Sequence, residues 1–288
     1  MLSRFGVFLM GALGALPLRW LRALGWMLGA MLYLVARSRR RVVRINLGLC
    51  YPQWSRARRR RVGFAVFIHF AQAWLDRGWL WHGSGHTTQG RLKLVGALEQ
   101  LAAGAPVLLF APHFVGLDAG WTALTGQLAR PFVTIYTHQA NATVDAWILR
   151  GRQRFGQTRL YDRAAGAKPL VAALREGAAL YLLPDMNYGL PESIFLPFYA
   201  VQAATVTSLS RLARLGRARV VPVLTRMTRD GYEVRLLPAW DGYPSGDLQA
   251  DTLRMNQTLE QFVDAMPEQY YWVHKRFKDR PQGEPPVY

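Results

Sequence analysis

The distribution of charge along the chain limits its possible folds more than any other sequence feature. The chain holds thirteen arginines and no acidic residue up to Leu75, and its first acid is Asp76. Most of the net charge of +18 therefore lies in the first quarter of the sequence. A region with this composition cannot neutralise itself through internal ion pairs. It is typical of a segment that binds a polyanion, either nucleic acid or an anionic membrane surface.

Two apolar segments in the same region favour the membrane. Residues 5–18 and 23–36 carry no charge, and each segment is fourteen residues long. Neither segment alone reaches the roughly 20 apolar residues that cross a bilayer. Arg19 and Arg22 lie between them on one helix face and can extend toward lipid headgroups. The sequence predicts a hydrophobic membrane-anchoring helix at residues 1–36, either as a tilted span or within the interface.

The arginines that follow the apolar segments predict a helical membrane-surface region at residues 37–90. By the positive-inside tendency, they place this region on the cytoplasmic side. Residues 62–75 are apolar nearly all round, which is typical of a buried or lipid-facing helix. The sequence has no zinc-finger spacing, aromatic RNA-binding signature or basic region with heptads, so nucleic acid is not expected as a partner. The arginines are Arg37, Arg39, Arg40, Arg41, Arg44, Arg56, Arg58, Arg59, Arg60 and Arg61.

The remainder of the chain alternates short apolar runs with helical patterns. This alternation predicts an α/β domain at residues 91–288, with a mixed central sheet flanked by helices. The single cysteine, Cys50, excludes an internal disulfide, and its apolar neighbours disfavour a reactive thiolate. Strands are expected at 106–111, 132–136, 179–183, 220–224 and 232–237, and helices at 96–103, 117–128, 143–155, 168–176, 204–215 and 248–265.

A histidine follows the first buried strand expected in this domain. His113 comes after the apolar run 107–111 and a proline, where α/β folds bind ligands. If His113 precedes the next helix, Asp118 can orient its imidazole, which then removes a proton from a hydroxyl. The spacing alone leaves a structural histidine equally open, because His274 and Asp279 repeat it. His274 lies in a basic segment without a preceding buried strand, which favours a role in structure or in binding phosphate.

The pattern from Pro112 through His113 to Asp118 resembles the first conserved block of the lysophospholipid acyltransferase superfamily. Other segments resemble its lipid A biosynthesis lauroyl/myristoyl acyltransferase branch. The sequence departs from that branch at Asp118, where many members have glutamate, and at Asn187, where some have a second aspartate. The first departure keeps the chemistry, whereas the second questions any two-carboxylate role for that loop. The matching segments are residues 44–52, 149–154, 183–189 and 267–278.

The resemblance implies transfer of a fatty acyl group from acyl carrier protein to the hydroxyl of a 3-hydroxyacyl chain on a lipid A precursor. The expected location is the cytoplasmic face of the inner membrane of a Gram-negative bacterium. His113 would be the general base and Asp118 its orienting acid. No metal or other cofactor is implied. The implied substrate-binding residues are Arg152, Arg154, Asp185 and Pro222.

Several alternatives to this assignment stay open at the level of sequence. Arg150 lies close enough to take the place of Arg152 or Arg154, and all three arginines could merely attract phosphates. Asp185 fits a turn cap, and Pro222 fits a plain edge strand. The chain could act on a glycerophospholipid, an ornithine lipid or a glycolipid. It could also be a non-catalytic protein that binds anionic lipid, in which case His113 would be dispensable.

Overall fold

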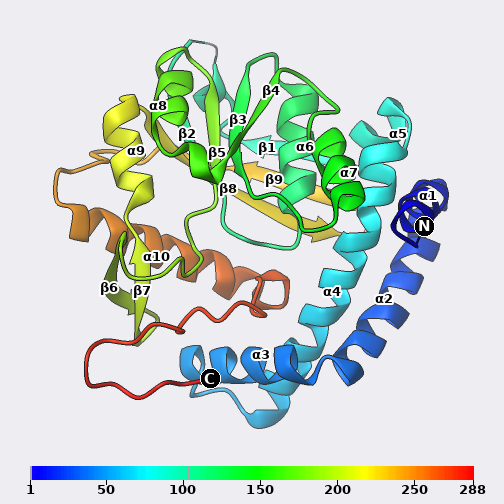
Figure 1. Cartoon of the computed structure of the whole chain (residues 1–288), viewed down its shortest axis with the longest axis horizontal. Coiled ribbons are helices and arrows are strands. Elements are labelled where there is room, and N and C mark those ends of the chain that lie inside the picture. Colours follow the sequence, from blue (N-terminus) through cyan, green and yellow to red (C-terminus); the bar gives the residue numbers. More distant parts are fainter. Residues whose placement is uncertain (1, 103) are drawn as a thin grey trace.

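The protein is described by a computed structural model covering residues 2–102 and 104–288 (Figure 1). Met1 and Ala103, which fall in the predicted anchor and the predicted helix 96–103, lie outside the described residues. The central sheet has seven strands in the order β1-β9-β8-β2-β5-β3-β4. Its pairs are parallel except β8 with β9, so the predicted mixed sheet is confirmed. The strands are β1 Leu92–Gly96, β2 Val107–Phe110, β3 Phe132–Tyr136, β4 Thr158–Asp162, β5 Ala179–Leu182, β8 Arg219–Thr228 and β9 Gly231–Leu236.

Helices cover both faces of this sheet, and a separate antiparallel hairpin lies beside it. The hairpin consists of β6, Ser193–Phe198, and β7, Val201–Val206. The helices are α1 Leu2–Gly14, α2 Leu18–Val35, α3 Arg37–Cys50, α4 Arg56–His82, α5 Gly85–Gly90, α6 Leu117–Gln127, α7 Ala142–Arg152, α8 Lys168–Arg175, α9 Ser208–Gly216 and α10 Leu248–Ala265.

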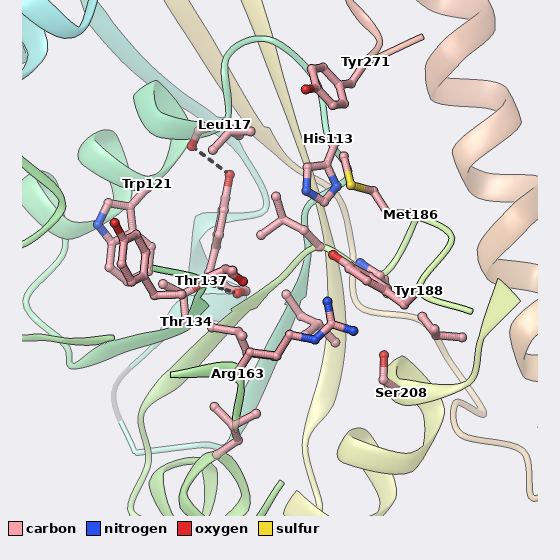
Figure 2. A pocket seen from close by; sticks show the side chains of 18 of the residues that line it. His113, Leu117, Trp121, Thr134, Thr137, Arg163, Met186, Tyr188, Ser208 and Tyr271 are labelled. Atoms are coloured by element: carbon pink, nitrogen blue, oxygen red, sulfur yellow. Dashed lines mark hydrogen bonds between the residues drawn. The ribbon is translucent and has the colours of Figure 1, made fainter. Parts of the chain in front are cut away.

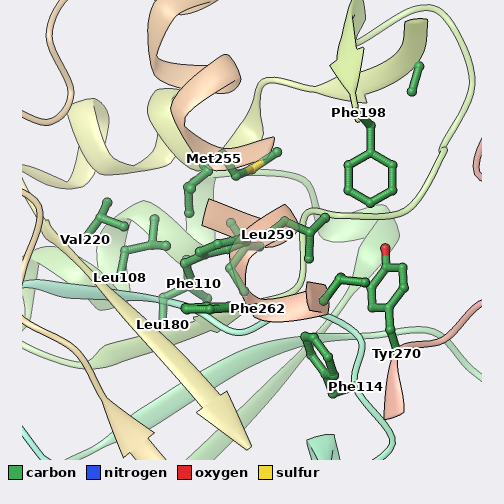
Figure 3. Close-up of a cluster of buried hydrophobic side chains, with 14 of the residues drawn as sticks. Leu108, Phe110, Phe114, Leu180, Phe198, Val220, Met255, Leu259, Phe262 and Tyr270 are labelled. Atoms are coloured by element: carbon green, nitrogen blue, oxygen red, sulfur yellow. The ribbon is translucent and has the colours of Figure 1, made fainter. Parts of the chain in front are cut away.

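The central strands are apolar on both sides because helices cover both sheet faces. In β2, Leu108 and Phe110 contribute to one buried cluster, with α8, α9 and α10 (Figure 3). Val107 and Leu109 alternate with them and contribute to a second cluster, with α4, α6 and α7. All four side chains are fully buried. This two-sided burial holds the carboxyl ends of β2 and β5 rigidly in place.

Helices α1 and α2, separated by residues 15–17, pack one after the other along the long helix α4 and form an N-terminal segment, the α1–α2 segment (Figure 1). Glycines allow the close approach. A Cβ on Gly29 would lie 2.6 Å from Ile68 Cα, and one on Gly25 would lie 2.8 Å from Gln72 Cα. In the part of the chain that the structure describes, no helix combines the length and apolar character needed to cross a membrane.

A buried ion pair fastens α2 to the rest of the molecule. Arg22 Nη1 lies 2.9 Å from Asp76 Oδ2, and Asp76 is completely buried. The Asp76 carboxylate also accepts hydrogen bonds from Tyr232 Oη, at 2.6 Å, and from Trp79 Nε1, at 2.9 Å. Burial raises the pKa of Asp76 against the opposing effect of Arg22. The first acid of the sequence is therefore the internal partner of an arginine from the basic region.

We expect Arg22→Met to destabilise the protein by about 2 to 3 kcal/mol, because it leaves Asp76 buried with only neutral donors. Chemical unfolding followed by tryptophan fluorescence measures this difference. Arg19→Met is the control: Arg19 lies three residues earlier in α2 and is exposed, so its replacement should change stability by less than about 0.5 kcal/mol. Equal stability of the two variants would contradict the anchoring role of the buried pair.

The predicted elements are largely present, and the differences have physical causes. Strand β3 and helix α10 have the predicted bounds, whereas residues 98–101 form only a short 3-10 turn. The predicted helix 204–215 begins at Ser208, because residues 201–206 pair with β6 instead. Strands β1, β4, β6 and β7 were not predicted. Strands β1 and β4 are the edge strands of the sheet, and their partly exposed side chains give no continuous apolar run.

Candidate active site

The site begins with two loops that leave adjacent parallel strands in equivalent positions. Strands β2 and β5 pair in register, with Phe110 opposite Leu182. His113 follows Phe110 by three residues, and Asp185 follows Leu182 by three residues, each directly after a proline. Because parallel strands end at the same edge of a sheet, this register brings the two side chains together. Residues 72 positions apart thus form one hydrogen-bonded pair.

The pair has the geometry of a general base with an orienting carboxylate. His113 Nδ1 lies 2.7 Å from Asp185 Oδ1, and the backbone N–H of His113 donates to both carboxylate oxygens, at 3.0 and 3.2 Å. Burial alone would raise the pKa of Asp185, but the charge of His113 and these hydrogen bonds outweigh burial and lower it. An ionised carboxylate can only accept, so Nδ1 carries a proton and Nε2 is left as the basic atom.

Asp118 does not orient His113, which corrects the expectation drawn from their spacing. Its carboxylate is bound by two arginines. Arg77 donates from Nε, at 2.8 Å, and from Nη2, at 2.6 Å, to one oxygen, and Arg152 donates from Nε, at 2.8 Å, to the other. Burial would raise the pKa of Asp118, but the two positive charges lower it. Asp118 thus stays ionised and fixes two guanidinium groups whose combined charge exceeds its own.

The histidine and both arginines line a large cavity of about 1020 Å³ at the carboxyl edge of the sheet. Figure 2 shows His113 on one side of this cavity, Trp121 and Thr134 on another, and Arg163 and Ser208 toward a different end. Phe70 and Trp74 of α4 add apolar wall. A space of this size and character suits an extended hydrocarbon chain next to polar groups that position its reactive end.

Of the residues that the resemblance assigned to substrate binding, Arg152 lines the cavity, whereas Arg154 and Pro222 do not. Arg154 donates to the carbonyl oxygens of Leu80, at 2.8 Å, and of Gly83, so it neutralises the C-terminal end of α4. Pro222 is buried in β8, opposite Phe110 of β2. Beyond it, β8 pairs with β9. Pro222 thus lies where the strand changes partner, which suits a residue without an N–H.

The C-terminal segment hydrogen-bonds to the two loops that carry His113 and Asp185. Tyr270 donates to Asp185 Oδ2, at 3.2 Å, and the N–H of Tyr271 donates to the carbonyl oxygen of His113, at 3.0 Å. His274 Nε2 accepts a hydrogen bond from the N–H of Asn187, at 2.9 Å, and thereby holds the loop that carries Asp185. These contacts give His274 a structural role, one of the two roles favoured by its sequence context.

Burial lowers the pKa of His274 to about 4. Below pH 6.5 the unfolded chain binds a proton at this histidine that the folded chain rejects, so stability falls as the pH is lowered from 6.5 toward 4. In His274→Gln the glutamine keeps an acceptor for Asn187 but does not titrate. When the pH is lowered from 7.5 to 5, we expect the free energy of unfolding of this variant to fall by about 1 to 2 kcal/mol less than that of the native protein. Unfolding curves at both pH values measure this. Parallel losses in the two proteins would exclude His274 as the titrating group.

The sequence does not identify Arg77 as a site residue, and it gives Asp185 as a substrate-binding residue, not as the partner of His113. Arg77 lies in the predicted apolar and basic helix, 41 residues from Asp118, and no motif connects the two. For Asp185 a signal was present: a proline and a polar residue follow each of two buried strands at the same distance. Cys50 is buried, and burial raises the pKa of its thiol, as its apolar neighbours predicted.

Comparisons with known proteins identify the family of the chain. The model of the bacterial lipid A biosynthesis acyltransferase family matches residues 1–279. A lipid A biosynthesis acyltransferase of Haemophilus influenzae is 31% identical over 285 residues, which cover 97% of this chain and 88% of the relative. The lipid A biosynthesis lauroyltransferase of Escherichia coli is 31% identical over 294 residues, covering 100% and 94%. Its myristoyltransferase is 32% identical over 257 residues, covering 87% and 78%. The chain belongs to the bacterial lipid A biosynthesis acyltransferase family.

Proposed function

We propose that this protein transfers a fatty acyl group from acyl carrier protein to the hydroxyl of a 3-hydroxyacyl chain on a lipid A precursor, forming a secondary acyloxyacyl ester. The observation that carries the proposal is the His113–Asp185 pair at 2.7 Å, which faces an apolar cavity of about 1020 Å³. The cavity accommodates acyl chains, and the pair supplies the base that hydroxyl acylation requires. We place the reaction on the cytoplasmic face of the inner membrane.

In the proposed reaction, His113 Nε2 takes the proton of the acceptor hydroxyl as its oxygen attacks the thioester carbonyl carbon. Asp185 keeps the proton on Nδ1 and stabilises the imidazolium that forms. When the tetrahedral intermediate collapses, the carbon–sulfur bond breaks and His113 returns the proton to the departing thiolate. The oxygen–carbon bond is formed directly between the substrates, so the scheme needs no covalent enzyme intermediate.

Arg152 is the proposed donor for the oxyanion of the tetrahedral intermediate. It binds Asp118 through Nε, and the described residues supply no hydrogen-bond partner to its two Nη groups. Asp118 and the neighbouring ring of Tyr136, 5.6 Å from the guanidinium carbon, fix its position. A preorganised cation in a cavity that excludes water stabilises developing charge strongly. Asp118 would thus act as a positioning residue for the arginine.

We further propose that the α1–α2 segment lies in the interface of an anionic membrane. Large apolar side chains are exposed along α1 and on one side of α2, and the arginines of α3 and α4 follow directly in the sequence. An apolar face flanked by cations is typical of helices that lie in the plane of the headgroups. The exposed side chains are Phe5, Phe8, Leu9, Trp20, Leu24, Trp26, Met27, Met31, Leu34 and Val35.

The membrane proposal predicts that Met27→Glu combined with Met31→Glu weakens binding to vesicles at least about tenfold, because both side chains are more than half exposed and would enter the lipid. Co-sedimentation with vesicles of phosphatidylglycerol and phosphatidylcholine measures the binding. Leu190→Glu is the matched control, because Leu190 is also exposed but lies in the loop after β5. Unchanged binding of the double variant would contradict the proposed orientation.

Purified protein and defined substrates test the function directly. The protein is incubated with acyl carrier protein that carries a thioester-linked fatty acid and with a lipid A precursor. The products are identified by mass spectrometry. We expect one additional acyl chain, ester-linked to a 3-hydroxyacyl group. Acylation of a glycerophospholipid with no change in the lipid A precursor would overturn the acceptor assignment. Mass spectrometry of lipid A from cells lacking the protein then gives the length and position of the missing chain.

A further inference from the structure

One end of the cavity, away from the Asp118 cluster, receives the N-terminus of α9. Val206, Thr207 and Ser208 line this end, and Figure 2 shows Ser208 at the start of the helix, with Tyr188 between it and His113 in this view. Thr207 occupies the N-cap position, yet its hydroxyl does not cap the helix. The residue is only 2% exposed, and among the described residues its hydroxyl has no hydrogen-bond partner. An unsatisfied buried hydroxyl is costly, so a ligand that offered this hydroxyl a partner would be stabilised here.

Two arginines face the same end of the cavity. Arg211 lies in the first turn of α9, and Arg163 follows β4, with its guanidinium carbon 4.0 Å from the centre of the Tyr188 ring. Neither arginine forms an ion pair with any residue that the structure describes. The acids at this end are Asp162, which accepts from the N–H of Ala164, and Glu192, and both are exposed.

We propose that Thr207, Ser208, Arg211 and Arg163 bind a phosphate ester. A helix N-terminus offers free N–H groups and a partial positive charge, the hydroxyls add donors, and guanidinium groups pair with phosphate oxygens. The site is separate from the Arg77–Asp118–Arg152 cluster. It therefore gives the cavity a second positively charged pole, which holds a substrate phosphate at a distance from the reacting carbonyl.

The phosphate ester that we assign to this site is the phosphodiester in the pantetheine arm of the acyl donor. This choice of the donor as the source of the phosphate rests on the proposed function. Figure 1 shows α9 on the side of the molecule opposite α1 and α2. With the α1–α2 segment at the membrane, α9 faces away from the bilayer, where a carrier protein approaches. The arm then enters from the α9 end and carries the thioester toward His113, while the lipid acceptor arrives from the membrane side.

The test compares the binding of 4′-phosphopantetheine and pantetheine, which differ by the phosphate alone, using isothermal titration calorimetry on the full-length protein. We expect the native protein to bind the phosphorylated arm about tenfold more tightly. Arg211→Gln should remove most of this preference, and Thr207→Val, which keeps the shape of the side chain, should reduce it. Arg214→Gln is the matched control. Arg214 lies three residues further along α9, is exposed and does not line the cavity, so its replacement should preserve the preference.

Equal affinity of the native protein for the two arms would overturn the donor assignment, as would equal losses in Arg211→Gln and Arg214→Gln. A parallel titration with glucosamine 1-phosphate and glucosamine distinguishes the other source of phosphate. If Arg211 discriminated only within that second pair, the phosphate would belong to the acceptor and the donor assignment would be wrong. Binding is measured without turnover, so the result does not depend on which hydroxyl the protein acylates.

Discussion

Asp185→Asn is expected to lower kcat by about 10³- to 10⁴-fold while leaving the KM of donor and acceptor within about twofold. Asp185 contacts His113 and Tyr270 and does not line the cavity, so in the proposed mechanism its replacement changes the base and leaves substrate binding intact. An asparagine amide can donate to Nδ1 and stabilise the tautomer in which Nε2 carries the proton. That tautomer cannot accept a proton from the acceptor hydroxyl. Steady-state kinetics with purified protein measures the effect.

A double-mutant comparison shows whether Asp185 acts through His113. His113→Ala sets the lower limit of activity, and adding Asp185→Asn to it should cause no further loss, because residues that act as a unit are not additive. A multiplicative loss in the double variant would mean that Asp185 has a separate function. Circular dichroism and unfolding curves of each variant establish that the fold is intact.

Asp118→Asn is expected to lower kcat by about 10²- to 10³-fold, because Arg77 and Arg152 lose the carboxylate that holds them at the cavity wall. Asp118→Glu should retain appreciable activity, since its carboxylate keeps the charge that pairs with both guanidinium groups. The same assay distinguishes the two possible roles of Asp118. If it positions Arg152, Arg152→Ala will mask the effect of Asp118→Asn, whereas Asp185→Asn and Asp118→Asn will multiply. Masking by His113→Ala instead would restore the role that sequence spacing suggested.

The buried parts of the fold were predictable because they leave a strong sequence pattern. β2, β3 and β5 are central or near-central strands covered on both faces, so each reads as a short apolar run. The β6–β7 hairpin leaves no such run. Pro197 interrupts β6, and the small residues Ala203 and Ala204 in β7 have helical propensity that pairing with β6 overrides. Local propensity therefore predicts the secondary structure of a segment correctly only where the tertiary pairing of that segment agrees with it.

The sequence predicted His113 as the candidate base, and the structure gives this histidine a different carboxylate partner from the one expected. The sequence offered Asp118 because it is five residues away, but the distance along the chain says little about distance across a sheet. Asp185 approaches His113 only because β2 and β5 are neighbours in register, and the order of parallel strands cannot be read from one sequence. Arg77 was missed for the same reason, since its contact depends on how α4 crosses α6. Arg77 also lies in the arginine-rich region 37–90, where composition alone does not distinguish one arginine from the others.

Asp76 and Arg77 are consecutive residues of α4 that bind two different parts of the protein. Asp76 binds Arg22 of α2, and Arg77 binds Asp118 beside the cavity. Removing residues 1–35 to obtain a more tractable protein would expose the surface of α4 that the glycines of α1 and α2 contact. It would also leave the buried Asp76 without its arginine. Asp76 directly precedes Arg77, which lines the cavity. The α1–α2 segment therefore supports the part of α4 that carries Arg77, and a shortened protein lacking it is expected to be a poor substitute for inhibitor screening.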